Sequence, residues 1–164
     1  MVLVMENKKL LQNFIIILKK NIDFCFDIKK FEDRIKLQKY VFIAKFFGLK
    51  HSYKYNMYIR GPYSSNLADD YYELEKNEND PVSDYLDLNI EDFSSLVKDK
   101  EVEWLESATT MLSLYSNYKS NYKSLLGNTD FEKLINDVCE IKHMIPENLI
   151  TQVYNELENY DLLN

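Results

Sequence analysis

The sequence predicts a mainly α-helical domain built around one central buried helix, with a short β strand or hairpin. Turn-forming residues are scarce, with 3 Gly and 3 Pro in 164 residues, which disfavours an all-β fold with many tight turns. Apolar residues recur at helical spacing in the first and last thirds. With 46% hydrophobic residues the chain has enough apolar side chains for a core, and we expect one domain over residues 1–164.

The first predicted helix spans residues 6–21. Its apolar side chains share one face: Leu10, Leu11, Phe14, Ile17 and Leu18. The second spans residues 34–47, with Asp33 as its N-cap and Gly48 at its end. This second helix is apolar on two sides, which is typical of a helix packed between other elements. One arc holds Leu37, Tyr40, Val41 and Ala44, and the other holds Ile35, Phe42, Ile43 and Phe46.

Residues 53–60 alternate between two sets of side chains, the period of a half-buried strand that Gly61-Pro62 ends. Ser64 or Ser65 is the expected cap of the next helix, and Asp69 and Asp70 are expected in its first turn. Residues 76–100 are acidic and predict a long loop with one helical turn near Glu91–Val97.

Three helices are predicted in the last third. The first spans residues 101–124, and Asn128 or Thr129 caps the second. The second carries an apolar stripe of Phe131, Leu134, Ile135, Val138 and Ile141. Pro146 suits the first position of the last helix, whose inner face is Leu149, Ile150, Val153 and Leu157.

The net charge of −7 is distributed unevenly. Residues 1–60 hold 13 Lys/Arg against 5 Asp/Glu, whereas residues 66–106 hold 3 against 14. A basic first third raises the alternative of a winged-helix-like DNA-binding regulator, with Lys29, Lys30, Arg34, Lys36 and Lys45 as its contacts. The low pI of about 4.9 and the presence of only two Arg oppose that alternative. The two charged regions can also neutralise each other across the fold, as solvated faces do.

No arrangement of side chains predicts catalysis, so we expect no enzyme activity, no cofactor and no metal. Cys139 and His143 have the i, i+4 spacing of two metal ligands, but the chain holds only two Cys and two His. A core thiol and an exposed imidazole explain this pair, and Cys25 and Cys139 are expected as buried thiols in a reducing compartment. The apolar run Phe14–Leu18 is too short to span a membrane, so a cytoplasmic protein is expected.

Two segments resemble a known family: KLQKYVFIAKFFG at residues 36–48 and YIRGPYSSNLADDYYEL at 58–74. They are similar to the YwgA-like proteins and the related SocA-like antitoxin (Panacea) domains, in which a KLQKL-type helix precedes an aromatic strand and a Gly-Pro turn. Eight residues match the motif: Lys36, Leu37, Gln38, Lys39, Gly61, Pro62, Tyr63 and Ser64. The segments 104–115 and 138–163 look like the closing helices of the family, so the resemblance covers most of the chain.

The resemblance implies a non-enzymatic helical module that binds a partner protein, as an antitoxin or an adaptor. We therefore expect a protein partner, a toxin or a protease substrate, and a structural role for the eight motif residues. Arg60, Tyr63, Asp84 and Asp87 are expected at the partner surface, because exposed aromatics and Arg are typical anchors. Gln38 lies on the one polar stripe of a buried helix, so its amide is expected to bind backbone near the Gly61–Ser64 turn.

Overall fold

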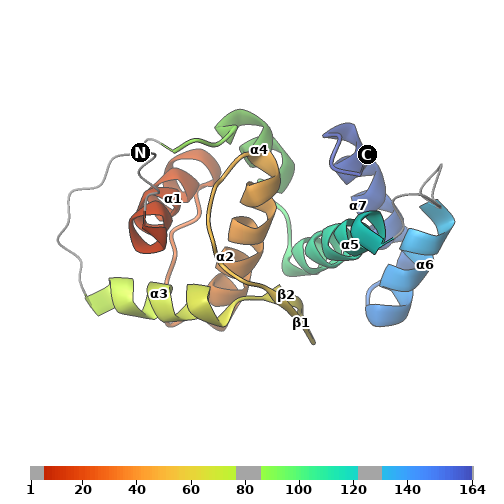
Figure 1. Cartoon of the computed structure of the whole chain (residues 1–164), viewed down its shortest axis with the longest axis horizontal. Helices are drawn as coiled ribbons and strands as arrows, with labels where there is room; N and C mark the ends of the chain where they lie inside the picture. The colour runs from red at the N-terminus through yellow and green to blue at the C-terminus, as the bar shows by residue number, and fades with distance from the viewer. Residues whose placement is uncertain (1–5, 77–85, 122–130, 164) are drawn as a thin grey trace. The chain divides into compact units, whose positions relative to one another are not determined.

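The computed structural model describes residues 6–76, 86–121 and 131–163, and it confirms a mainly helical chain with a small two-stranded sheet (Figure 1). Contacts divide the chain into two compact units. The N-terminal unit holds Met1–Asn56 and Tyr63–Asp99, and the C-terminal unit holds Met57–Pro62 and Lys100–Asn164. One domain over the whole chain therefore stays a prediction. The expected caps Asn128 and Thr129 lie outside the described residues.

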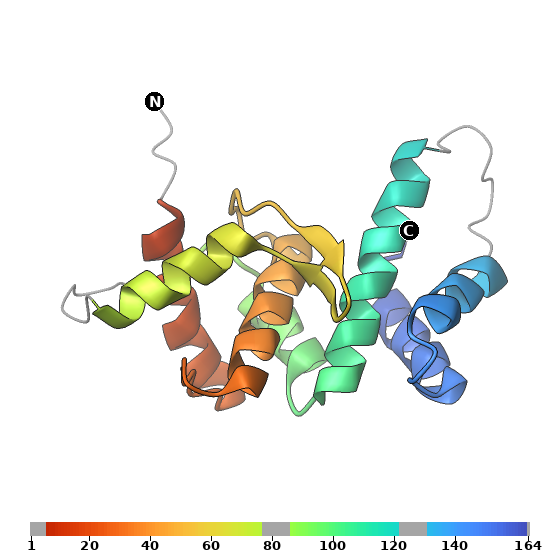
Figure 2. The same cartoon turned by 90° about the horizontal axis from the view of Figure 1, so that it is seen from below.

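The N-terminal unit is a cluster of helices. It consists of α1 (Asn7–Ile22), α2 (Phe31–Ala44), the 3-10 helix η1 (Lys45–Phe47), α3 (Ser65–Lys76) and α4 (Ile90–Val97). Helix α1 packs against α3 and α4, and α2 packs against α4 (Figure 2). The rings of Phe14 and Phe93 join α1 to α4, with centroids 5.6 Å apart. Helix α4 is longer than the predicted single turn, and the side chain of Asn89 caps it by accepting a hydrogen bond from the Asp92 N–H.

Helix α2 is the central helix that the sequence predicts. All five residues from 37 to 41 are buried, and at 100° per residue they surround the helix completely. The second apolar arc is only partly confirmed, because Ile43 is buried whereas Ile35, Phe42 and Phe46 are half-buried. Asp33 is not the N-cap. The helix begins at Phe31, and Asp33 instead accepts a hydrogen bond from the Asp27 N–H at 2.9 Å.

The residues predicted to end the second helix and to begin the third are partly confirmed. Gly48 has φ 107°, a left-handed conformation that favours glycine, so it ends η1 as expected. Ser64 caps α3 because its hydroxyl accepts a hydrogen bond from the Leu67 N–H at 3.3 Å. The expected place of Asp69 and Asp70 in the first turn is wrong, since α3 begins at Ser65.

The predicted strand over residues 53–60 is a hairpin in the structure. Strand β1 covers Asn56–Tyr58, a two-residue turn follows, and strand β2 covers Gly61–Tyr63. Gly61 and Pro62 thus begin a second strand rather than end the first, and a two-stranded sheet tolerates proline because its outer edges need no ladder partner. The predicted alternation holds at Tyr53, which is buried, and fails at Ile59, which is 95% exposed.

The C-terminal unit packs three helices against one another. They are α5 (Val102–Asn121), α6 (Phe131–Ile141) and α7 (Glu147–Asn159). The predicted inner faces are buried at their centres: Leu134, Ile135 and Val138 on α6, and Ile150, Val153 and Leu157 on α7. Pro146 precedes α7 instead of occupying its first position. Trp104, the single tryptophan, is buried on α5, with the Lys100 ammonium 5.0 Å from its ring centroid.

The two cysteines differ from the prediction of buried thiols. Cys25 is exposed, Cys139 is half-buried, and both are free thiols. The reason for Cys25 is its place in the connector between α1 and α2, which leaves it outside the helix packing. None of the helices within the described residues combines the length and the apolar character of a membrane span.

Candidate functional site

Gln38 of α2 binds the backbone of Ser64 through both ends of its side-chain amide. Its Nε2 donates to the Ser64 carbonyl at 2.9 Å, and its Oε1 accepts from the Ser64 N–H at 2.9 Å. Both residues are buried, so each bond satisfies a group that water cannot reach. The predicted hydrogen bonds of Gln38 are confirmed.

The other motif residues occupy structural places. Leu37, Lys39, Gly61 and Pro62 are buried, and Lys36 is ion-paired with Glu32 at 3.2 Å. The hydroxyl of Tyr55 donates to the carbonyl of Gln38 at 3.2 Å. The structural role of the motif as a whole stays a prediction.

The residues expected at a partner surface do not form one cluster within either unit. Arg60 belongs to the C-terminal unit, and Tyr63 and Asp87 belong to the N-terminal unit. Tyr63 is 36% exposed, and Asp87 is exposed with its carboxylate 3.8 Å from the Lys50 ammonium. Asp84 lies outside the described residues.

A partly buried ionic cluster in the C-terminal unit holds the turn of the hairpin. We call Lys142, Glu106 and Arg60 the Lys142 cluster. The ammonium of Lys142 donates to the carbonyl of Ile59 at 2.9 Å and lies 3.4 Å from Glu106 Oε2. Arg60 Nη1 lies 3.4 Å from Glu106 Oε1, while the side chain of Lys142 is only 5% exposed. Sequence reasoning missed this cluster, although Lys142 continues the i, i+4 row of Leu134 and Val138.

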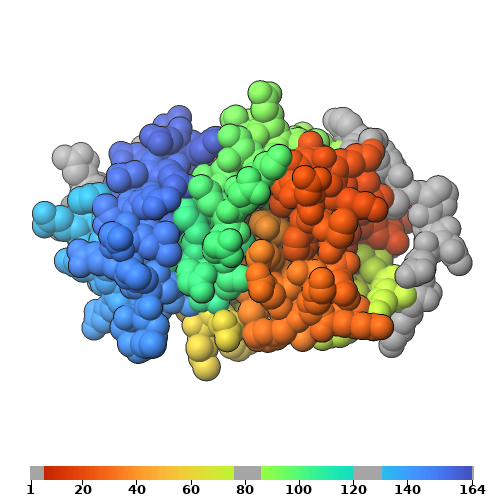
Figure 3. Space-filling model, turned by 180° about the vertical axis from the view of Figure 1, so that it is seen from behind, coloured from red at the N-terminus to blue at the C-terminus, as the bar shows by residue number. Residues whose placement is uncertain are grey.

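The hairpin tip, Met57–Arg60, presents large apolar side chains to solvent. Met57 is 42% exposed, Tyr58 is 51% exposed and Ile59 is 95% exposed. The yellow atoms of the hairpin are visible at the surface in Figure 3. Met144, in the turn before α7 of the same unit, is 86% exposed. Met57, Tyr58 and Ile59 are consecutive in the chain, and a contiguous exposed apolar surface is typical of interaction sites.

The basic residues of the DNA-binding alternative are only partly available. Lys29, Lys30 and Lys45 are exposed. Arg34 instead donates to the carbonyl of Ile28, and Lys36 is engaged with Glu32.

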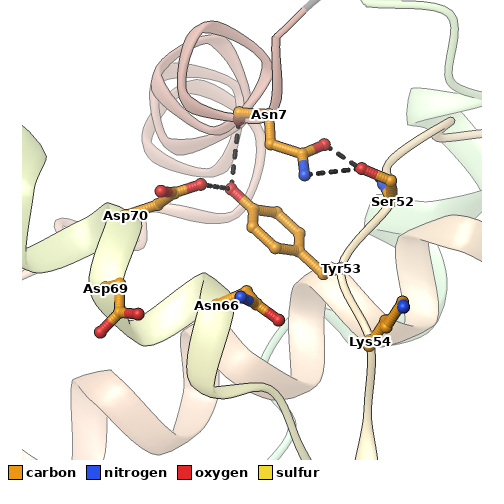
Figure 4. Close-up of a pocket in the computed structure, with 7 residues that line it drawn as sticks. All are labelled: Asn7, Ser52, Tyr53, Lys54, Asn66, Asp69 and Asp70. Atoms are coloured by element: carbon orange, nitrogen blue, oxygen red, sulfur yellow. Dashed lines mark hydrogen bonds between the residues drawn. The ribbon is translucent and has the colours of Figure 1, made fainter.

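A polar pocket of about 420 Å³ lies within the N-terminal unit (Figure 4). Its walls are Asn7 at the start of α1, the extended segment 52–54, and three residues of α3. The α3 residues are Asn66, Asp69 and Asp70, whose i, i+3 and i+4 spacing places them on one face of the helix. The hydroxyl of Tyr53 lies 2.6 Å from Asp70 Oδ2 and 3.2 Å from the carbonyl of Asn7.

Tyr53 and Asn7 fix the shape of this pocket. The amide of Asn7 donates to the Ser52 hydroxyl at 2.8 Å and accepts from the Ser52 N–H at 3.2 Å, so segment 52–54 is tied to α1. Burial, followed by the hydrogen bond with Asp70, raises the pKa of Tyr53 well above its usual value. The phenol therefore stays protonated and continues to donate.

His51 is a buried imidazole beside this segment. It accepts from the Tyr53 N–H through Nδ1 at 3.2 Å, so its proton is on Nε2, 3.2 Å from the carbonyl of Val41. Burial is the main reason that the pKa of His51 falls to about 4, and the charge of Lys45 lowers it further.

Within the described part of the chain, no group of three or more His, Cys, Asp or Glu is placed to hold a metal ion. Cys139 is half-buried on α6, and His143 is exposed in the turn that follows α6. Comparisons with protein families, with curated proteins and with solved structures found no match to this chain.

Proposed function

We propose that this chain is a non-enzymatic protein-binding module of the antitoxin or adaptor type, acting in the cytoplasm. The observation that carries the proposal is the exposed hairpin tip. Ile59 is 95% exposed at a two-residue turn, with the half-exposed Met57 and Tyr58 before it. Apolar surface in water is unfavourable, and covering it with a partner recovers that free energy. Long apolar and aromatic side chains are frequent anchors of protein interfaces.

The way in which the tip is held supports the same proposal. Lys142 is buried and donates to the carbonyl of Ile59, while Glu106 accepts both Lys142 and Arg60. A turn tied down on its backbone side loses little conformational entropy when its side chains are buried by a partner. The two free thiols fit a reducing compartment such as the cytoplasm.

The test is a tagged pull-down of the full chain from its native cell, treated with nuclease, with partners quantified by mass spectrometry. We expect one stoichiometric protein, and we expect Ile59→Asp to abolish its capture because a carboxylate replaces the apolar anchor. Phe31→Asp is the matched control, since Phe31 is 56% exposed at the start of α2, away from the tip in sequence. Capture that survives Ile59→Asp would contradict the proposal.

The alternative is a DNA-binding regulator that uses the basic first third. Its exposed lysines at positions 29 and 30 lie immediately before α2. A DNA-binding protein would bind random duplex with a steep salt dependence, and Lys29→Ala with Lys30→Ala would weaken it. Binding of this kind, without a stoichiometric protein partner, would favour the alternative.

A further inference from the structure

We draw no further inference here: the strongest candidate, the surface patch of Ile141 and Met144 at the end of α6 and in the turn that follows it, is exposed and apolar, but nothing in the structure shows what covers it.

Discussion

Each unit contains a buried side chain that binds the backbone of a distant turn, and the two side chains are of opposite character. In the N-terminal unit, the neutral amide of Gln38 binds both backbone groups of Ser64. In the C-terminal unit, the charged ammonium of Lys142 binds the carbonyl of Ile59 and depends on Glu106 for its counter-charge. The amide satisfies a donor and an acceptor together. The ammonium satisfies one acceptor and must itself be neutralised by a partner.

Because of this difference, substitution of Gln38 and of Lys142 should reduce stability by different amounts. Removing an amide leaves two buried polar groups without partners, each a moderate penalty. Removing the ammonium leaves the carboxylate of Glu106, which is only 11% exposed, without its buried counter-charge. Its other partner, Arg60, is 55% exposed and lies at the surface. An uncompensated buried charge is the larger penalty, so the C-terminal contact should be the more sensitive of the two.

Lys142→Met should therefore have the largest effect, a loss of about 4 kcal/mol in the free energy of unfolding. Urea unfolding followed by circular dichroism measures it. Glu106→Gln combined with Lys142→Met should recover part of the loss, because the orphaned charge is then gone. Lys133→Met, which breaks the more exposed pair with Asp137, should change stability by no more than about 1 kcal/mol. Equal losses at both lysines would mean that burial of the Lys142 cluster does not matter.

Gln38→Ala should cost about 3 kcal/mol, since the Ser64 N–H and carbonyl both lose their partner in a buried place. The thermal midpoint and urea unfolding both report this change. Gln152→Ala is the control, because Gln152 is exposed on α7 and, among the described residues, its side chain bonds to Glu156 alone. An unchanged midpoint for Gln38→Ala would remove the basis of the comparison between the two contacts.

A third prediction concerns the pH dependence of stability. The Gln38 contact does not contribute to it, because an amide does not titrate. The folded pKa of His51 is about 4, below the usual 6.5 of the unfolded chain, because burial disfavours the imidazolium. Between these values the unfolded state binds a proton that the folded state does not. Stability should thus fall by roughly 2–3 kcal/mol as the pH drops from about 6.5 to about 4. Unfolding at several pH values should show this slope flattened by His51→Gln and kept by His143→Gln, a change at an exposed residue.

The smallest expected effect on stability comes from the hydroxyl of Ser64, which can be removed without touching the backbone groups that Gln38 binds. Ser64→Ala keeps both bonds to Gln38 and removes only the cap on the Leu67 N–H, so it should cost about 1 kcal/mol. Ser65→Ala, at the exposed neighbouring position, should change stability by less than about 0.5 kcal/mol. If Ser64→Ala matched Gln38→Ala in the same thermal melt, the hydroxyl rather than the amide pair would hold this turn.

The sequence predicted the Gln38 contact and missed the Lys142 cluster for a physical reason. Gln38 lies on the one polar stripe of a helix that is apolar on two sides, and a buried amide must find backbone groups. Lys142 follows Ile141 and precedes His143 at a helix end, where a lysine is normally solvated. Its burial depends on the carboxylate of Glu106, which lies 36 residues away in the chain, and local patterns carry no such information.

The hairpin shows the same limit. Alternation of residues 53–60 correctly indicated extended backbone, and Tyr53 is buried as its position predicts. The turn lies at Ile59 and Arg60, and Gly61 follows it with φ 94°, a left-handed conformation that favours glycine. Gly61 therefore marks the turn, but the Pro after it predicts an end to extended backbone, so the second strand was missed. The polar pocket could not be predicted from the sequence either, because its walls come from three segments that only the packing of α1 and α3 brings together.

The burial of Trp104 gives the protein an internal reporter. Trp104 is the single tryptophan of the chain and lies in the core of the C-terminal unit, with Lys100 against its ring. Its intrinsic fluorescence therefore follows the unfolding of that unit alone, whereas far-ultraviolet circular dichroism follows the helices of both units. Coincident transitions by the two signals would mean that the chain unfolds as one cooperative body. Separated transitions would mean that the two units are independent in stability, and each substitution could then be assigned to one of them.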